Sequence, residues 1–273
     1  MQMETDLIAS KFEAMGARVK FNTPPRHVWG LREEPNEDAV TLDIRRDRKG
    51  EYFDIRAGAN IGLNVIDLRP GERHLLLMSR SKEGKSKFLC GHDERHWFVA
   101  AVPEAASASN VSTAMDALKP PEVLEAQERK RIKHKARNLR KTNASIRQGE
   151  WFFIPAPHLK VDDHLVLKDE PLVRGGKPHV AEYLYRRGGE TVYVSGDYPD
   201  GLTQEQFTDL KHQPTGQAGW LGRFRTMRRN AQVFVKGTIT HPDHKTIRLT
   251  TWHEVKPNTE TQAKAMRHVA FLD

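Results

Sequence analysis

Apolar and polar residues alternate over much of the first hundred residues, which predicts short strands. A helix precedes them, because apolar residues of segment 6–15 recur at helical spacing and Gly16 follows as a C-cap. Segments 40–44 and 51–55 alternate on either side of an Asp-Arg-Lys-Gly turn, so they form a predicted hairpin. Further turn signals divide residues 63–102 into four more strands, and we expect an antiparallel meander there.

The second half shows the same alternation after an interruption. Residues 103–121 are rich in Ala, Ser, Asn and Pro, which predicts a domain boundary with one short helix near 112–118. Gly188-Gly189 predicts one hairpin turn, and His241-Pro242-Asp243-His244 predicts another. The predicted strands of this half are 151–154, 164–167, 180–185, 191–195, 232–240 and 245–253.

A helix connects the two halves in this interpretation. Pro120 and Pro121 are tolerated in a first helical turn, acidic residues favour the N-terminal end, and we expect helix over 122–141. The predicted fold class is α+β and β-rich, with two antiparallel-sheet domains, meander-like or barrel-like, joined by a basic helix. The N-terminal β-rich domain with its leading helix covers 1–105, the linker and basic helix cover 106–148, and the C-terminal β-rich domain covers 149–273.

Positive charge is concentrated in that predicted helix. The chain of 273 residues has 44 Lys+Arg, 36 Asp+Glu and a net charge of +8. A stretch without any acid, which we call the basic segment, contains Arg129, Lys130, Arg131, Lys133, Lys135, Arg137, Arg140, Lys141 and Arg147. Subtracting these nine charges leaves −1 for the rest of the chain, so the basicity is local.

Cations at this density repel one another, and the repulsion is relieved by a polyanion or by an acidic protein surface. Because the basic segment lacks the alternating acids of an ordinary exposed helix, we predict contacts with the phosphates of a nucleic acid, DNA or RNA. Docking on an acidic protein partner and plain solvation stay open as alternatives. Membrane binding is not expected, because the apolar stripe of this helix has no Trp or Phe to anchor it.

A second cationic stretch contains aromatic residues and lies in a glycine-rich region predicted as loop. Its members are Trp220, Arg223, Arg225, Arg228 and Arg229. Arginine planes and aromatic rings stack on unpaired bases, so this composition suits single-stranded nucleic acid. The alternative is that Trp220 and Phe224 fill the core while the arginines face water.

Histidines of the second half suggest a metal site. Zinc takes three or four N, S or O ligands at about 2.0–2.3 Å. His241 and His244 flank one tight turn and are the first candidates, whereas ~30 Å of strand separates His253 from them. Further candidate ligands are His158, Asp163, His164 and His179. A divalent metal such as zinc is thus a candidate cofactor, and ordinary turn and surface imidazoles are the alternative.

Other features of the chain narrow the function classes. A single cysteine, Cys90, forms no internal disulfide, the N-terminal residues lack the apolar core of a secretory signal, and no apolar run approaches the ~18 residues of a membrane span. We therefore expect a cytoplasmic protein. P-loop, dinucleotide-binding and zinc-protease motifs are absent. Three functions stay open: nucleic-acid binding, His-ligated metal-assisted hydrolysis as by a hydrolase or nuclease, and a non-enzymatic adaptor or assembly role.

Overall fold

The computed structural model describes residues 2–22, 37–174, 177–212 and 223–264. These residues form a β-rich fold, as predicted. The helices are α1 (Gln2–Ala14), α2 (Val111–Ala117), α3 (Pro121–Arg129) and α4 (Gln204–His212). The strands are β1 (Val19–Asn22), β2 (Val40–Asp47), β3 (Gly50–Ala57), β4 (Gly62–Arg69), β5 (His74–Ser81), β6 (Gly84–Asp93), β7 (His96–Val102), β8 (Ile146–Gln148), β9 (Trp151–Pro155), β10 (Leu167–Leu172), β11 (His179–Arg187), β12 (Glu190–Ser195), β13 (Tyr198–Leu202), β14 (Arg225–Arg229), β15 (Gln232–Thr240) and β16 (Ile247–Pro257).

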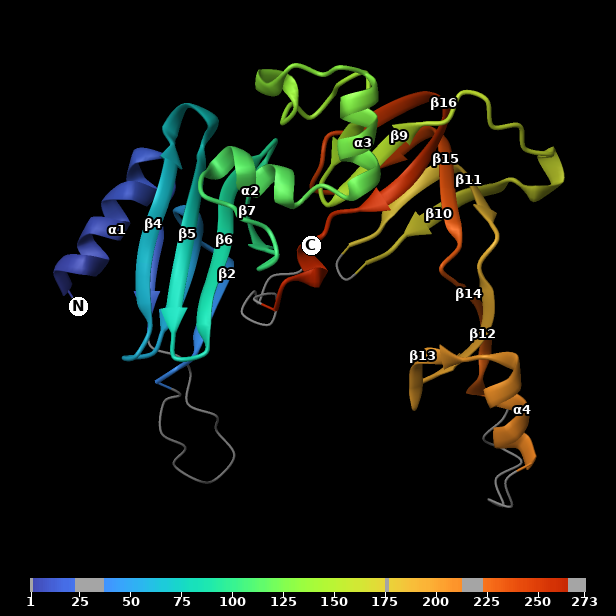
Figure 1. The fold of residues 1–273 in the computed structure, drawn as a ribbon, viewed down its shortest axis with the longest axis horizontal. Helices are drawn as coiled ribbons and strands as arrows, with labels where there is room; N and C mark the ends of the chain where they lie inside the picture. The colour runs from blue at the N-terminus through green and yellow to red at the C-terminus, as the bar shows by residue number, and fades with distance from the viewer. Residues whose placement is uncertain (1, 23–36, 175–176, 213–222, 265–273) are drawn as a thin grey trace.

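The N-terminal half is built in layers around a four-stranded sheet (Figure 1). This sheet, β4-β5-β6-β7, is the antiparallel meander that the turn signals predict. The sheet β1-β3-β2 and helix α1 cover one face, and α2 covers the other. Because both faces are covered, β5 buries successive leucines: Leu75 and Leu77 belong to the cluster with α1, and Leu76 to the cluster with α2.

The C-terminal half is built on a six-stranded sheet in the order β10-β11-β15-β16-β9-β8. The sheet curls around a core that includes Phe153 and Val235. The curl brings β8 close to the β15–β16 turn, where the Gln148 side chain donates a hydrogen bond to Lys245 O at 2.9 Å. Helix α3 packs against Phe152 on the outer face. The strand order is open, so none of the sheets in the described residues is a closed barrel.

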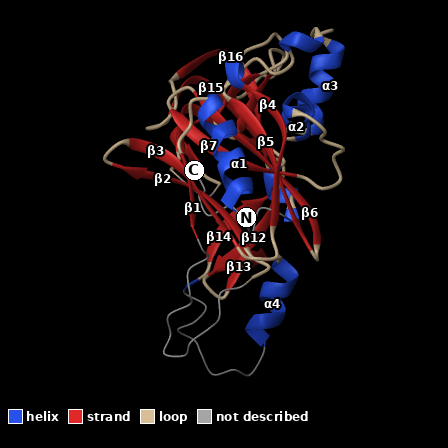
Figure 2. Cartoon of the chain, turned by 90° about the vertical axis from the view of Figure 1, so that its left-hand side faces the viewer, coloured by secondary structure: helices blue, strands red, loops and turns tan. Residues whose placement is uncertain are grey.

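A β-ribbon arm projects from the C-terminal sheet and ends in the small sheet β13-β12-β14, with α4 beside it (Figures 1 and 2). The predicted hairpin turn at Gly188-Gly189 is wrong, because β11 pairs with β15 and β12 pairs with β14. The chain instead runs straight on into the arm. A Cβ on Gly189 would lie 2.9 Å from Ala231 N, so the opposite strand passes directly beside this glycine.

The predicted basic helix is also wrong. Helix α3 ends well short of residue 141, and much of the basic segment lies in turns, the 3-10 helix His134–Ala136 and β8. A Schellman motif ends α3: Arg131 has a left-handed φ of 52°, its N–H donates to Glu128 O, and Ile132 N–H donates to Gln127 O. Ile132 then packs, partly buried, against the α3 core, and the chain leaves the helix at this contact.

Two further predictions concern the strand over 164–167 and the division of the chain into two domains. The strand predicted over 164–167 is mostly absent, because Asp163–Leu165 form a 3-10 turn and β10 begins at Leu167. Near its end the chain returns to the N-terminal half: Thr259 N–H donates to Leu118 O, and Ala263 lies in the N-terminal core. The division into two domains with a linker over 106–148 stays a prediction.

Candidate metal centre and adjoining cavity

Three histidines meet where two neighbouring strands and a turn come together. His179 begins β11, His241 follows β15, and His244 lies in the turn between β15 and β16. Pairing of Val180 with Thr240 places His179 beside His241, and the tight turn brings His244 back to both. One ligand-capable atom of each histidine lies within 4.8 Å of the others. The structure therefore brings together three of the residues that the sequence suggested as ligands.

The three imidazole rings are buried and nearly parallel. Ring centroids lie 4.2 Å apart for His179 and His241, 4.6 Å for His241 and His244, and 5.4 Å for His179 and His244. The interplanar angles are 25°, 27° and 20°. His179 is 1% exposed and the other two are 7% exposed, so bulk water reaches the rings very little.

Burial keeps these imidazoles neutral. Desolvation, followed by the neighbouring imidazoles, lowers the pKa of His179 to about 3, and desolvation followed by His241 lowers the pKa of His244 to about 4. Desolvation also lowers the pKa of His241. Neutral imidazole is the form that binds transition metals. At neutral pH the three rings are thus in the state that a metal requires.

Ring nitrogens of the cluster lack hydrogen-bond partners within the described residues. Nδ1 and Nε2 of both His179 and His244 are buried and unpartnered. His241 differs, because its Nδ1 accepts from Asp243 N–H and its Nε2 lies 3.1 Å from Lys177 O. A buried polar group without a partner costs about 1–3 kcal/mol. Several such nitrogens at one place favour a ligand site over a packed core, with His179 and His244 as the principal ligands.

The β8–β9 turn supplies a carboxylate and a close backbone contact to the cluster. Glu150 Oε1 lies 4.0 Å from His179 Nδ1, and the Glu150 side chain is 11% exposed. Gly149 has a φ of +57°, and a Cβ there would lie 2.6 Å from His244 Nε2. A side chain at position 149 would therefore displace the His244 ring. Glu150 is near enough to act as a further ligand or as a proton acceptor.

This donor set fits zinc better than magnesium or calcium. Zinc favours imidazole nitrogen and carboxylate oxygen in tetrahedral sites, whereas the two harder cations require mostly oxygen ligands. Ligand atoms of a zinc tetrahedron lie about 3.3 Å apart. The histidine nitrogens lie within 4.8 Å of one another, so the stacked rings must turn and move closer together to reach that spacing.

The other predicted ligands lie elsewhere. His158, Asp163 and His164 are exposed in the connection between β9 and β10, and none of them belongs to the histidine cluster. His253 is buried on β16 and lies outside the cluster, as expected. The structure therefore leaves these residues without a part in the candidate metal centre.

The basic segment is divided into paired and exposed cations. Arg140 forms an ion pair with Glu94, and Arg147 forms one with Asp93 at 3.2 Å, both between the two halves. Arg137 is half-buried. The remaining members are exposed and have no ion pair within the described residues: Arg129, Lys130, Arg131, Lys133, Lys135 and Lys141. Self-pairing thus accounts for only part of the segment's charge.

The second cationic stretch forms part of the arm. Trp220 lies outside the described residues, and the stretch predicted as loop contains strand β14. The exposed arginines are Arg223, Arg225 and Arg228. Arg229 pairs with Glu190 at 2.7 Å. Phe224 packs against Phe207 with ring centroids 4.9 Å apart, so this ring contributes to the small core of the arm.

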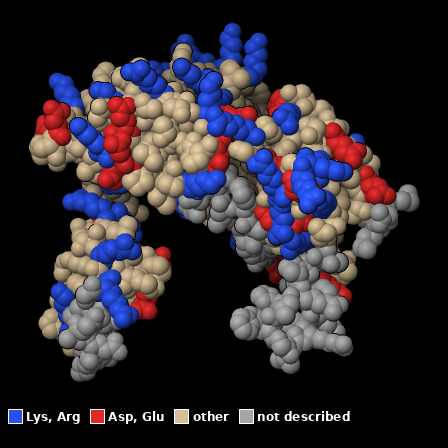
Figure 3. Space-filling view, turned by 180° about the vertical axis from the view of Figure 1, so that it is seen from behind, with Lys and Arg blue, Asp and Glu red and all other residues tan. Residues whose placement is uncertain are grey.

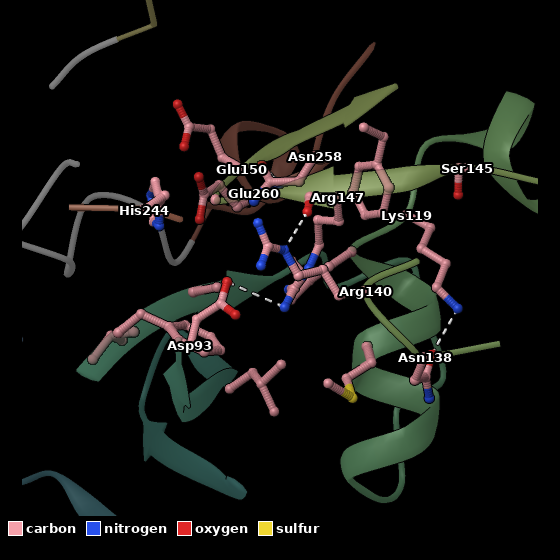
Figure 4. Close-up of a pocket in the computed structure, with 18 of the residues that line it drawn as sticks. Asp93, Lys119, Asn138, Arg140, Ser145, Arg147, Glu150, His244, Asn258 and Glu260 are labelled. Atoms are coloured by element: carbon pink, nitrogen blue, oxygen red, sulfur yellow. Dashed lines mark hydrogen bonds and ion pairs between the residues drawn. The ribbon is translucent and has the colours of Figure 1, made fainter. Parts of the chain in front are cut away.

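A cavity of about 290 Å³ lies between the two halves beside the cluster. In the close-up of Figure 4, His244 and Glu150 lie on one side, Arg140 and Arg147 in the middle, and Lys119 on the other side. Because His244, Gly149 and Glu150 line this cavity, a metal on the cluster would be within reach of a molecule held there.

Gly149 and Glu150 were not among the residues that the sequence suggested for the site. The Gly-Glu pair before Trp151 is a recognisable turn signal, but nothing in the linear sequence places that turn next to His244. The curl of the six-stranded sheet does so. Asp93 and Glu94, which anchor two arginines of the basic segment, were missed for the same reason.

Comparison with models of known protein families, with curated proteins and with solved structures found no match to this chain. Within the described residues, no helix has the length and apolar character needed to cross a membrane.

Proposed function

We propose that this protein binds a divalent transition metal ion, zinc in the first instance, and uses it to hydrolyse an anionic substrate in the adjoining cavity. The principal ligands are His179 and His244, and the third is His241, which must give up one of its two hydrogen bonds, to Asp243 N–H or to Lys177 O, in order to bind the ion. The observation that supports this most is the set of buried, unpartnered ring nitrogens on neutral imidazoles. Three protein ligands leave one position for water or substrate, which is the arrangement typical of catalytic zinc.

The chain supplies groups suited to hydrolysis around the cluster. A bound zinc ion lowers the pKa of its water to about 7 and polarises the attacked group. Glu150, whose Oε1 lies 4.0 Å from His179 Nδ1, would be the carboxylate available to accept a proton if zinc were bound at the cluster. The guanidinium groups of Arg140 and Arg147 line the same cavity and offset negative charge on the substrate.

Metal content tests this proposal directly. The full chain is stripped with a chelator, reloaded with zinc, desalted and analysed by mass spectrometry of the elements. We expect about one zinc per wild-type chain, and loss of this zinc in His179→Ala/His244→Ala. The matched control, His158→Ala/His164→Ala, removes two exposed imidazoles and should retain the metal. Equal zinc in both double variants, or substoichiometric zinc in the wild type, would refute the proposal.

Hydrolysis is tested with bis(4-nitrophenyl) phosphate as an anionic probe ester. The zinc-loaded wild type should release nitrophenol, and Glu150→Gln should lose at least about tenfold in rate while retaining zinc, because only the proton acceptor is removed. Zinc binding without any hydrolysis of this or a comparable ester would confine the proposal to metal binding.

Nucleic-acid binding is a second candidate, supported by a different observation. Six exposed cations of the basic segment have no ion pair within the described residues. Figure 3 shows Lys and Arg side chains along the upper edge of the molecule with fewer acids among them. Such a surface suits the phosphates of DNA or RNA and supplies affinity without base identity.

Salt dependence tests this second candidate. We expect log K to fall with log salt by about 0.9 per phosphate contact on duplex DNA, or about 0.7 on single strands. Lys130→Gln/Lys133→Gln/Lys135→Gln should flatten that slope by about 2–3. Lys82→Gln/Lys85→Gln, at exposed positions in the β5–β6 turn and at the start of β6, is the matched control and should leave the slope unchanged. Equal slopes for the triple variant and the wild type would exclude the basic segment from nucleic-acid binding and leave docking on an acidic protein surface or plain solvation.

A further inference from the structure

The cavity beside the histidine cluster has an apolar wall that both halves build. Leu118 comes from the core cluster of α2, and Phe152 comes from the core cluster of α3. Leu139 also lines the cavity and is 61% exposed, so a leucine side chain stands at its edge in contact with water. At about 290 Å³ the cavity is near the lower limit of small-molecule sites and is too small for a nucleic-acid helix.

The polar wall carries more cations than acids. The cations are Lys119, Arg137, Arg140, Arg147 and Arg174, and the acids are Asp93, Glu150 and Glu260. Burial raises the pKa of Glu260, and its carboxyl group pairs with Arg174 at 3.7 Å. The Lys119 ammonium is already held by acceptors that include Asp116 and Asn138, so its part is structural.

Arg147 is the cation best placed to receive an anion. Its side chain lies in the middle of the cavity in Figure 4 and is 24% exposed. Within the described residues it has one ion pair, to Asp93 at 3.2 Å, whereas a guanidinium has five N–H donors. Arg140, beside it, donates to the carbonyl of Lys245, the residue after His244. An anion on Arg147 is therefore near the candidate metal centre.

We propose that this cavity binds a small amphipathic oxyanion. Its phosphate or carboxylate group binds the Arg147 guanidinium and faces the part of the cavity that His244 lines. Its apolar body lies against Leu118, Phe152 and Leu139. Only the naming of this molecule as the substrate rests on the proposed function, because the binding itself needs no metal. The substrate class is then a small phosphate ester, or an ester that carries a separate free carboxylate, with an apolar body, and not a polymer.

Calorimetric titration of the full, metal-free chain tests the proposal, with phenyl phosphate, benzoate and inorganic phosphate as probes. At least one aromatic probe should bind about tenfold or more tightly than inorganic phosphate, because the ring buries apolar area. Comparison of phenyl phosphate with benzoate identifies the preferred anionic group. Arg147→Gln should weaken the aromatic probe at least about tenfold. Arg186→Gln, at an exposed position near the end of β11, is the matched control and should leave the affinity for the aromatic probe unchanged.

Two further variants separate binding from folding. Asp93→Asn removes the carboxylate that competes with the ligand for Arg147, so the affinity for the aromatic probe should increase. If the Asp93–Arg147 pair had only a structural role, this variant would not increase the affinity. Leu139→Ala, at an exposed position, should weaken phenyl phosphate and leave inorganic phosphate unchanged. No binding of either aromatic probe, equal affinity for phenyl phosphate and inorganic phosphate, or no response to Arg147→Gln and Asp93→Asn would overturn the proposal. Because metal is absent, these results do not depend on whether the histidines bind zinc.

Discussion

His179 and His244 are kept neutral by burial, and this has a consequence for stability at the residue scale. In the unfolded chain both imidazoles titrate near 6.5, whereas in the folded protein their pKa values are about 3 and about 4. Between these values the unfolded state binds more protons than the folded state, so acid favours unfolding. The contribution of the neutral rings is complete above pH 6.5 and is lost as the pH falls toward the folded pKa values.

We therefore predict that the metal-free protein loses stability between pH 6.5 and pH 5. Each imidazole contributes at most about 1.4 kcal/mol per pH unit to the free energy of unfolding. Denaturant titrations at several pH values measure this slope, which should be shallower in His179→Leu because that variant has no proton to gain there. His158→Ala, an exposed position, should keep the wild-type slope. Parallel slopes for His179→Leu and the wild type would contradict this account.

At the scale of elements, the β8–β9 turn fixes the position of His244. Gly149 combines a positive φ with backbone that lies against the imidazole, so both the conformation and the contact require glycine. The same turn carries Glu150 into the cavity. A short hairpin thus positions one candidate ligand through its glycine and presents the carboxylate from the next residue.

Gly149→Ala should lower both zinc affinity and stability. The added Cβ would lie 2.6 Å from His244 Nε2 and must displace the ring, and the left-handed conformation costs a non-glycine residue about 1–2 kcal/mol. We expect zinc affinity, measured by competition with a chromophoric chelator, to fall at least about tenfold. Gly62→Ala, where a Cβ would meet nothing within 4 Å, is the control. Wild-type zinc affinity in Gly149→Ala would show that His244 is not a ligand.

At the scale of the whole molecule, the β6–β7 turn connects the N-terminal half to the candidate metal centre. Glu94 forms an ion pair with Arg140 and accepts a hydrogen bond from the N–H of Lys245, and Asp93 pairs with Arg147. The arginines come from the basic segment, and Lys245 follows His244. Contacts between the halves and the geometry of the cluster therefore share the same few residues.

Glu94→Ala should weaken both the contact between the halves and the metal centre. Loss of the shared carboxylate leaves Arg140 without its ion pair and the Lys245 N–H without its acceptor, at a cost of about 1–3 kcal/mol in the free energy of unfolding. Zinc affinity should fall as well, because the backbone next to His244 loses an anchor. Denaturant unfolding and chelator competition measure the two effects. Asp209→Ala, exposed on α4, should change neither quantity, and a stable Glu94→Ala with unchanged affinity would disprove the coupling.

The sequence by itself determined the local elements. The alternation of apolar and polar residues, together with turn-forming residues, predicted the hairpin of β2 and β3 and the meander of β4 to β7. The Pro-Asp pair predicted the turn that holds His241 and His244. These features follow from the alternation of side chains across a strand and from turn-forming residues, both of which operate over a few positions.

Only the tertiary structure decided where α3 ends and which residues form the site. Nine neighbouring cations after an acidic start resemble the end of a long helix, but the chain leaves α3 through a Schellman turn where Ile132 packs, partly buried, against the α3 core. His179 joins His241 through strand pairing, and Gly149 reaches His244 through the curl of the sheet. Such contacts join residues far apart in the chain, and local periodicity carries no information about which distant strands pair or how strongly a sheet curls.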